Sequence, residues 1–142
     1  MTIDVREMVR ADAPAVAELS AQLGYKATPA EVTRRFMRLQ QTNDGFFVGV
    51  RGAEVAGWLH VYGVRLLETD GYAEIGGLVV DIAVRRQGIG RQLVARAEAW
   101  AAAHGFGELR LRSGLRRGEA HAFYRQLGYE LVKTGYMFRK GV

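Results

Sequence analysis

The sequence predicts a single mixed α/β (α+β) domain that spans residues 1–142. Three observations predict it. Short apolar runs at 46–50, 55–63 and 73–84 are separated by turn residues, as in antiparallel hairpins. A glycine-rich turn then leads into a long segment with helical apolar spacing. One strand, one helix and two strands follow, which gives the order β-α-α-β-β-β-α-β-α-β-β.

The N-terminal part is expected to begin with a strand at residues 3–8. Asp12 is a typical helix cap, and Pro14 lies in the first turn after it. We therefore expect a helix there that ends at Gly24, the residue type that most often follows a helix.

A second helix is predicted directly afterwards. Thr28 and Glu31 have the spacing of a capping box, with Pro29 at the first helical position between them. Apolar side chains then recur at helical spacing, so one face of this helix should be buried. These residues are Val32, Phe36 and Leu39.

The next three predicted strands are joined by turns at residues 51–54 and 68–71, after an earlier turn at 42–45. The third of these strands contains the pair Gly76-Gly77. Glycines inside a strand indicate a bulge or a close approach of another group to the backbone.

The C-terminal half contains a predicted helix at 88–104 that ends at Gly105. Its apolar stripe is Ile89, Leu93, Ala97, Trp100 and Ala101. A strand at 108–113 and a helix at 119–127, closed by Gly128, are expected next. Two final strands are expected at 129–133 and 136–140.

The composition excludes several classes of protein. The chain has no cysteine, which excludes disulfide scaffolds and cysteine-based zinc sites. It has no apolar segment long enough for a membrane span, and its first ten residues lack the apolar core of a signal peptide. We expect a cytoplasmic protein with no membrane partner and no metal. The net charge of +5 suggests an acidic partner, either nucleic acid or a polyphosphate cofactor.

The glycine-rich turn predicts a phosphate site. Gly88 and Gly90 leave the backbone bare at the start of a helix, and Arg85, Arg86 and Arg91 surround them. The N-terminus of a helix offers unpaired amides and the positive end of a dipole, which together suit an anion. The lysine and the serine or threonine of a P-loop are missing, and the third glycine of a dinucleotide fingerprint is missing too.

Two motifs together resemble one known family. The first is Arg85-x-x-Gly88-x-Gly90, between a strand and a helix. The second is Ala120-x-x-x-Tyr124-x-x-x-Gly128-Tyr129. At this spacing the chain is similar to small bacterial single-domain GNAT acyl-CoA N-acyltransferases. The resemblance implies the GNAT fold, acetyl-CoA as co-substrate, and direct acetyl transfer to an amine without an acyl-enzyme.

The resemblance also implies a cofactor site on the central strand and on the turn. The coenzyme would contact Leu78, Val79, Val80, Arg85, Arg86, Gln87, Gly88, Ile89, Gly90 and Arg91. The pantetheine arm would pair with free backbone groups at 78–80, and the pyrophosphate would lie on the amides of the turn.

The resemblance implies that Tyr124 is the acid that protonates the departing thiolate, and an ordinary tyrosine pKa of about 10 would keep it protonated at neutral pH. Glu74 is expected to be the base, with a role in substrate binding or a plain surface position as alternatives. Glu119 and His121 are further candidates for the base. Asp81 is expected to stabilise the loop instead.

The chain departs from its relatives where many of them carry an asparagine before the motif helix. Gly114 or Arg117 stands there, so that contact with coenzyme A is in doubt. The acceptor is expected to be a small-molecule amine, held between residues 22–40 and 58–72. The aromatic candidates there are Tyr25, Phe36, Trp58, His60 and Tyr62.

Other functions stay open at this point. The acceptor could be a protein N-terminus or a lysine, and the domain could bind acyl-CoA without catalysis. A nucleic-acid-binding module is disfavoured, because the basic turn has no interleaved aromatic residues. We therefore expect no nucleic-acid partner. The C-terminal strands suggest a homodimer, as is common in the family.

Overall fold

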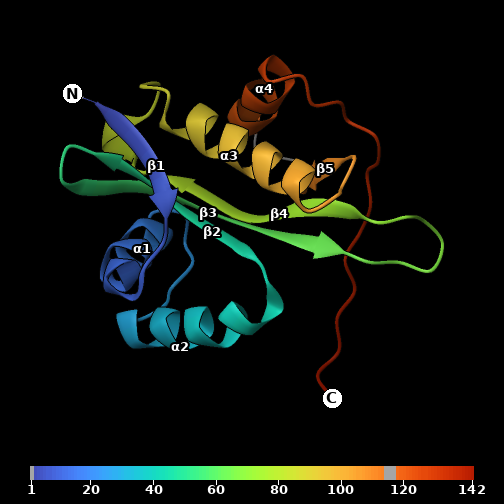
Figure 1. Cartoon of the computed structure of the whole chain (residues 1–142), viewed down its shortest axis with the longest axis horizontal. Helices are drawn as coiled ribbons and strands as arrows, with labels where there is room; N and C mark the ends of the chain where they lie inside the picture. Colours follow the sequence, from blue (N-terminus) through green and yellow to red (C-terminus); the bar gives the residue numbers. More distant parts are fainter. Residues whose placement is uncertain (1, 114–117) are drawn as a thin grey trace. The chain divides into compact units, whose positions relative to one another are not determined.

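The computed structural model describes residues 2–113 and 118–142, in two compact units that meet in sequence at Arg112 and Ser113. In the described residues the first unit holds a five-stranded mixed sheet with helices on both faces (Figure 1). Its strands are β1 (Ile3–Glu7), β2 (Gly45–Arg51), β3 (Glu54–Val64), β4 (Tyr72–Val80) and β5 (Leu109–Leu111). Its α-helices are α1 (Ala13–Ala21), α2 (Pro29–Leu39) and α3 (Ile89–Ala103). The mixed α/β class is confirmed.

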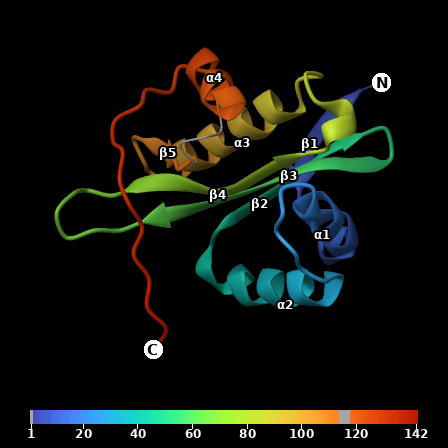
Figure 2. The same ribbon diagram turned by 180° about the vertical axis from the view of Figure 1, so that it is seen from behind.

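The strand order is β1-β2-β3-β4-β5, so each strand pairs with its neighbours in the sequence. The first three pairings are antiparallel and β4 pairs β5 in parallel. Helices α1 and α2 cover one face of the sheet and α3 covers the other, as the views from opposite sides show (Figures 1 and 2). The hairpin at residues 51–54 is confirmed, since Arg51 pairs with Glu54.

The start of helix α3 packs directly against glycines of the sheet. A methyl group on Gly49 would lie 2.7 Å from Cγ2 of Ile89, and one on Gly57 would lie 3.1 Å from Cδ1 of Leu93. Both apolar side chains are almost fully buried. The predicted stripe is thus the buried face of α3, and the glycines of β2 and β3 fix the depth at which the start of α3 sits.

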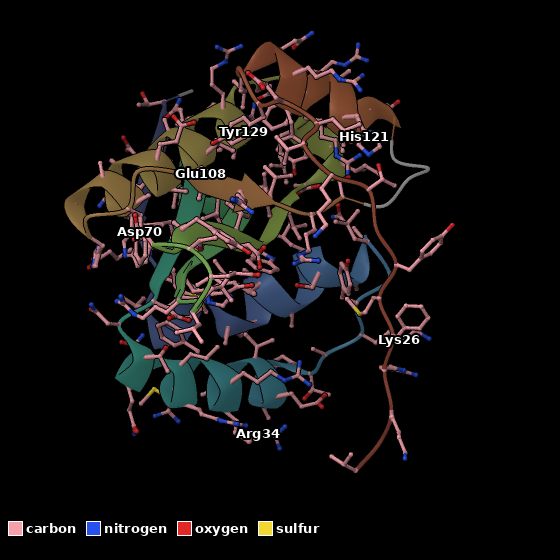
Figure 3. The ribbon with its side chains drawn as sticks, turned by 90° about the vertical axis from the view of Figure 1, so that its right-hand side faces the viewer. Lys26, Arg34, Asp70, Glu108, His121 and Tyr129 are labelled. Atoms are coloured by element: carbon pink, nitrogen blue, oxygen red, sulfur yellow. The ribbon has the colours of Figure 1, made fainter. Side chains whose placement is uncertain are left out.

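Helix α2 begins as predicted. Thr28 Oγ1 accepts from the Glu31 N–H at 3.1 Å, and Glu31 Oε1 accepts from the Thr28 N–H at 3.0 Å. The buried face of α2 presents Phe36, whose ring meets Phe46 of β2 edge-on at 5.3 Å. The opposite face is charged, and Arg34 lies there, away from the sheet (Figure 3).

The predicted helix-capping role of Asp12 is wrong. Asp12 does precede α1, but its carboxylate makes no hydrogen bond to the first turn of that helix. Oδ2 accepts instead from the Val9 N–H at 2.8 Å, and both oxygens bind the Arg6 guanidinium, at 2.8 and 2.9 Å. A bidentate, charge-assisted contact with Arg6 is stronger than a neutral amide bond, so the carboxylate turns toward β1.

The Gly76-Gly77 pair forms the predicted bulge. His60 pairs with Gly77 and Val61 pairs with Ile75, so Gly76 is an extra residue in β4. Rings from β3 pass close to both glycines. A methyl group on Gly77 would lie 2.5 Å from the Trp58 ring.

The second unit contains α4 (Gly118–Gln126), and Gly128 follows the end of this helix with φ +92°, as predicted. The prediction of two final strands is wrong, because residues 129–142 contain no strand. Their apolar side chains are exposed, including Leu131 at 73% and Phe138 at 90%. Strand-forming residues become a strand only when a partner strand accepts and donates their hydrogen bonds, and this segment has none in the described chain. Among the described residues, no helix combines the length and the apolar character that a membrane crossing requires.

Candidate active site

The turn between β4 and α3 has a specific backbone path. It leaves the sheet at Asp81, whose N–H donates to the Ala56 carbonyl at 2.8 Å. A short 3-10 turn follows at Ile82–Val84. Arg86 then has φ +66° and Gly88 has φ +90°, and α3 begins at the next residue. A left-handed residue directly before the helix favours glycine at 88.

The first turn of α3 presents its amides to the outside. The first backbone bond of the helix runs from the Gln92 N–H to the Gly88 carbonyl, at 3.1 Å. The amides of Ile89, Gly90 and Arg91 therefore have no acceptor within the helix. Open space surrounds Gly88, and the arginines at 85, 86 and 91 are exposed. The arrangement suits a phosphate group.

The side chain of Gln22, directly after α1, makes two hydrogen bonds to this turn. Its Oε1 accepts from the Ile82 N–H at 2.9 Å, and its Nε2 donates to Oδ1 of Asp81 at 3.2 Å. The same Asp81 oxygen accepts from the Ala83 N–H at 3.0 Å. Asp81 thus stabilises the loop as predicted. Gln22 was missed, because nothing in the sequence links two residues that lie 59 positions apart.

The central strand β4 has an open edge beside the turn. β5 pairs only with Ala73–Ile75, and the rest of β4, from Gly76 to Val80, has no partner on that side among the paired strands described. Leu78 and Val80 are half-buried and Val79 is buried. Free backbone groups at this edge can pair with an extended ligand.

Glu74 lies at the buried end of this strand, only 8% exposed. The Tyr62 hydroxyl donates a short hydrogen bond to Oε2 of Glu74, and Arg112 Nε donates to Oε1 at 3.4 Å. Burial, followed by the bond to Glu74 and the charge of Glu74, raises the pKa of Tyr62 to about 12. Tyr62 is therefore protonated at neutral pH, and the carboxylate already has two partners.

His60 lies two residues before Tyr62 on β3, so both side chains are on the same face of the sheet. Its Nε2 is 2.8 Å from Oδ2 of Asp44, and its ring stacks on Phe46 at 4.5 Å and lies 5.3 Å from Tyr62. The sequence predicted Phe36, His60 and Tyr62 as neighbours of the acceptor, and the structure joins them through Phe46. Asp44 was missed, because the turn at 42–45 gave no sign that its carboxylate faces a histidine.

Tyr124 lies on α4, where its ring contacts Phe123 at 5.3 Å and Tyr129 at 6.3 Å. Tyr124 belongs to the second unit, and its contacts are described within that unit alone. Glu119 and His121 lie on the same helix. Gly114 and Arg117, the positions that replace the asparagine of many relatives, lie outside the described residues.

Comparison with known proteins identifies the family. The sequence model of the acetyltransferase (GNAT) family matches residues 11–129. The uncharacterized N-acetyltransferase YhdJ of Bacillus subtilis (strain 168) is 39% identical over 69 residues, which are 48% of this chain and 47% of that protein. The match therefore spans about half the length of that curated relative.

Solved structures share the fold over nearly the whole chain. A transcriptional regulator from Bacillus halodurans C-125 is 27% identical, with a TM-score of 0.87 over 98% of this chain and 100% of that one. Aminoglycoside N-acetyltransferase AAC(6′)-Iy, in complex with CoA, is 17% identical, with a TM-score of 0.86 over 98% and 95% of the two chains. With a family match over most of its length and the same architecture, the chain belongs to the acetyltransferase (GNAT) family.

Proposed function

We propose that this protein is an N-acetyltransferase that moves the acetyl group of acetyl-CoA directly to a primary amine of a small molecule. The observation that carries the proposal is the first turn of α3. In a chain of this family, bare amides and three exposed arginines lie where the open edge of β4 ends.

Coenzyme A would use both features. Its pyrophosphate would lie on the amides from Gln87 to Arg91, and one or two of the arginines would contact its 3′-phosphate. The pantetheine arm would pair with the backbone at 78–80. A backbone amide of that edge would point at the thioester oxygen. It would stabilise the charge that develops there by about 3 kcal/mol.

The chemistry requires a neutral amine and a protonated leaving group. The amine nitrogen forms a bond to the thioester carbon, the carbon–sulfur bond breaks, and the thiolate takes a proton. We assign that proton to Tyr124, by the motif it occupies. Glu74 is the base expected from the sequence, and as a buried carboxylate it would attract the ammonium group of the acceptor.

A small-molecule acceptor is supported by the structural neighbours, several of which are named aminoglycoside acetyltransferases. The aromatic row Phe36, Phe46, His60 and Tyr62 would form one wall of the acceptor site. A peptide N-terminus is the alternative acceptor.

A second candidate function is acyl-CoA binding without catalysis. The similar structure from Bacillus halodurans is named a transcriptional regulator, which favours this alternative. Turnover of the thioester across a panel of amines separates the two functions, because a regulator would bind acetyl-CoA and leave it intact.

We also propose a homodimer. Residues 129–142 carry exposed apolar side chains and no strand partner, and a second copy could supply one. Light scattering at tens of micromolar tests this, and a monomeric mass would contradict it.

The cofactor assignment is tested by calorimetric titration of acetyl-CoA. Gly90→Val places a branched side chain where the pyrophosphate would lie, and it should abolish binding while the fold stays intact. Gly107→Val is the matched control, since Gly107 has open space around it and lies outside the proposed site. Normal binding by the Gly90 variant would show that the assignment is wrong.

A further inference from the structure

We propose that His60, oriented by Asp44, is the base that removes the proton from the acceptor ammonium, and that Glu74 binds and positions. This inference rests on the proposed acetyl transfer. It is carried by the orientation of the imidazole, by its place beside the bulge in β4, and by the partners that Glu74 already has.

Asp44 fixes which nitrogen of His60 carries the proton. A carboxylate only accepts hydrogen bonds, so the 2.8 Å contact with Nε2 requires Nε2 to be the donor. In a neutral imidazole the other nitrogen then has a free lone pair. Nδ1 is therefore the basic atom, and stacking on Phe46 limits rotation of the ring.

Nδ1 faces the point where the edge of β4 opens. A methyl group on Gly76 would lie only 3.0 Å from Nδ1, so any side chain at this position would crowd the nitrogen, and glycine does not. Gly76 is exposed, and the pairing of β4 with β5 ends one residue earlier, at Ile75. No hydrogen bond to Nδ1 is formed by residues 2–112, the described part of the first unit. The free lone pair thus lies beside the stretch that would hold the thioester.

Glu74 is less well placed to take a proton. Its two oxygens accept hydrogen bonds from Tyr62 and from Arg112, and both contacts would have to rearrange before an ammonium proton could take their place. Arg112 also offsets its charge, although that arginine is largely exposed. Both oxygens of Glu74 therefore already have a donor, whereas Nδ1 of His60 has none among residues 2–112.

The proposed step is a simple proton transfer. An N–H bond of the ammonium breaks and its electron pair stays on nitrogen, while the Nδ1 lone pair takes the proton. The imidazolium is stabilised by the Asp44 carboxylate, which is 11% exposed. The neutral amine then attacks the thioester, the carbon–sulfur bond breaks, and the departing thiolate takes a proton from the general acid. The second amine proton passes through water to replace the proton that the acid gave up, and the imidazolium releases its proton to water, so one proton is released overall.

The neighbouring charges favour this role for His60. Among the described residues, Asp44 contacts the ring directly, Glu74 is linked to it through Tyr62, and Arg112 binds Glu74. Tyr62 lies between His60 and Glu74 and stays neutral, because its pKa is raised to about 12. The imidazolium would therefore form next to one carboxylate and near a second.

His60→Gln tests the proposal, because glutamine can still donate to Asp44 but cannot take a proton. With strongly basic primary amines, kcat/KM at neutral pH should fall about 10²-fold while acetyl-CoA binding is unchanged. With weakly basic amines, which are already neutral, the loss should shrink to a few-fold. His104→Gln is the matched control, since His104 binds the Trp100 carbonyl on α3 and lies outside the site.

A long-range 1H–15N spectrum of the wild-type imidazoles gives a second readout that needs no amine. It should show His60 with a protonated Nε2 and a bare Nδ1, and Asp44→Asn should weaken this preference. An Nδ1–H tautomer in the wild type would overturn the proposal, as would a loss in His60→Gln that is equal for amines of every basicity. If wild-type protein acetylates no amine in the panel, the proposed function itself is wrong. If it does and His60→Gln is fully active, only this inference is wrong.

Discussion

Gln22 and Asp81 lie 59 positions apart in sequence, yet Gln22 Nε2 donates to Asp81 Oδ1 at 3.2 Å. Gln22 also accepts from the Ile82 N–H, so one amide side chain satisfies two groups of the turn that leads to α3. Because Gln22 directly follows α1, this contact connects that helix to the proposed cofactor loop.

Gln22→Ala should therefore weaken acetyl-CoA binding without unfolding the protein. The variant loses two hydrogen bonds, each with a net value of about 1 kcal/mol, so affinity should fall by up to about 30-fold. Gln22→Glu should be worse, since it keeps an acceptor for Ile82 but places a carboxylate against Asp81. Calorimetric titration measures the affinity, and hydrogen exchange at the Ile82 amide should speed up in parallel.

Gln41→Ala is the control for this pair, because Gln41 is exposed and far from the loop in the sequence. Unchanged affinity and unchanged Ile82 exchange in Gln22→Ala would show that the turn holds its shape through its own backbone.

The contact between Arg6 and Asp12 predicts a pH-dependent stability. The Arg6 guanidinium, followed by the Val9 amide, holds the pKa of Asp12 below its ordinary value, against the opposing effect of burial. The contribution is then fully present above the unfolded aspartate pKa of about 3.9 and is lost as pH falls through the lower native value. Asp12→Asn should lower the free energy of unfolding by about 2 kcal/mol at pH 7.

Urea unfolding at a series of pH values checks this prediction. The difference between wild type and Asp12→Asn should shrink below pH 4, while Asp4→Asn, on the exposed side of β1, should have little effect at any pH. A difference that persists unchanged into acid would mean that the ion pair is not its source.

Patterns in the sequence correctly predicted the features that depend on interactions between residues close together in the chain. The Thr28–Glu31 capping box depends on residues three positions apart, and the bulge at Gly76 depends on a glycine that tolerates it, so both could be read directly. Asp12 has the same local signature as a cap, but a competing partner on β1 turns its carboxylate away. The prediction of the two final strands was wrong for a related reason. A strand forms only where another strand pairs with it, and the spacing of residues in the sequence does not show whether such a partner exists.

The candidate site likewise has features that the sequence predicted and features that it did not. The glycines and arginines of the turn are contiguous, and the turn has the backbone that they predict. The roles of Gln22 and Asp44 could not be predicted, because each side chain contacts residues that are distant in the sequence and no local pattern indicates such a contact. Glu74 was singled out by its position on the strand, but its contacts with Tyr62 and Arg112 only became apparent in three dimensions.

Tyr62→Phe should test how strongly the buried Glu74 depends on its donor. The loss leaves a buried carboxylate oxygen without a partner, so the free energy of unfolding should fall by about 1–3 kcal/mol. Because the pKa of Tyr62 is raised to about 12, the difference should be constant at neutral pH. It should decrease only above the unfolded tyrosine pKa of about 10, as pH rises toward 12. Tyr25→Phe is the control, since Tyr25 is 64% exposed.

The last prediction concerns direct transfer and the acid. Neither the glycine-rich turn nor the motif helix pairs a serine with a base, and the chain has no cysteine, so no acyl-enzyme is expected. Tyr124→Phe should lower kcat by roughly 10²-fold, the usual scale for a general acid, with little change in acetyl-CoA affinity. Tyr136→Phe should be fully active, since Tyr136 is 90% exposed. Initial-rate kinetics should give the intersecting lines of a ternary complex. Parallel lines, or an acetylated protein trapped for mass spectrometry, would refute direct transfer, whereas a fully active Tyr124→Phe would move only the acid role to another group.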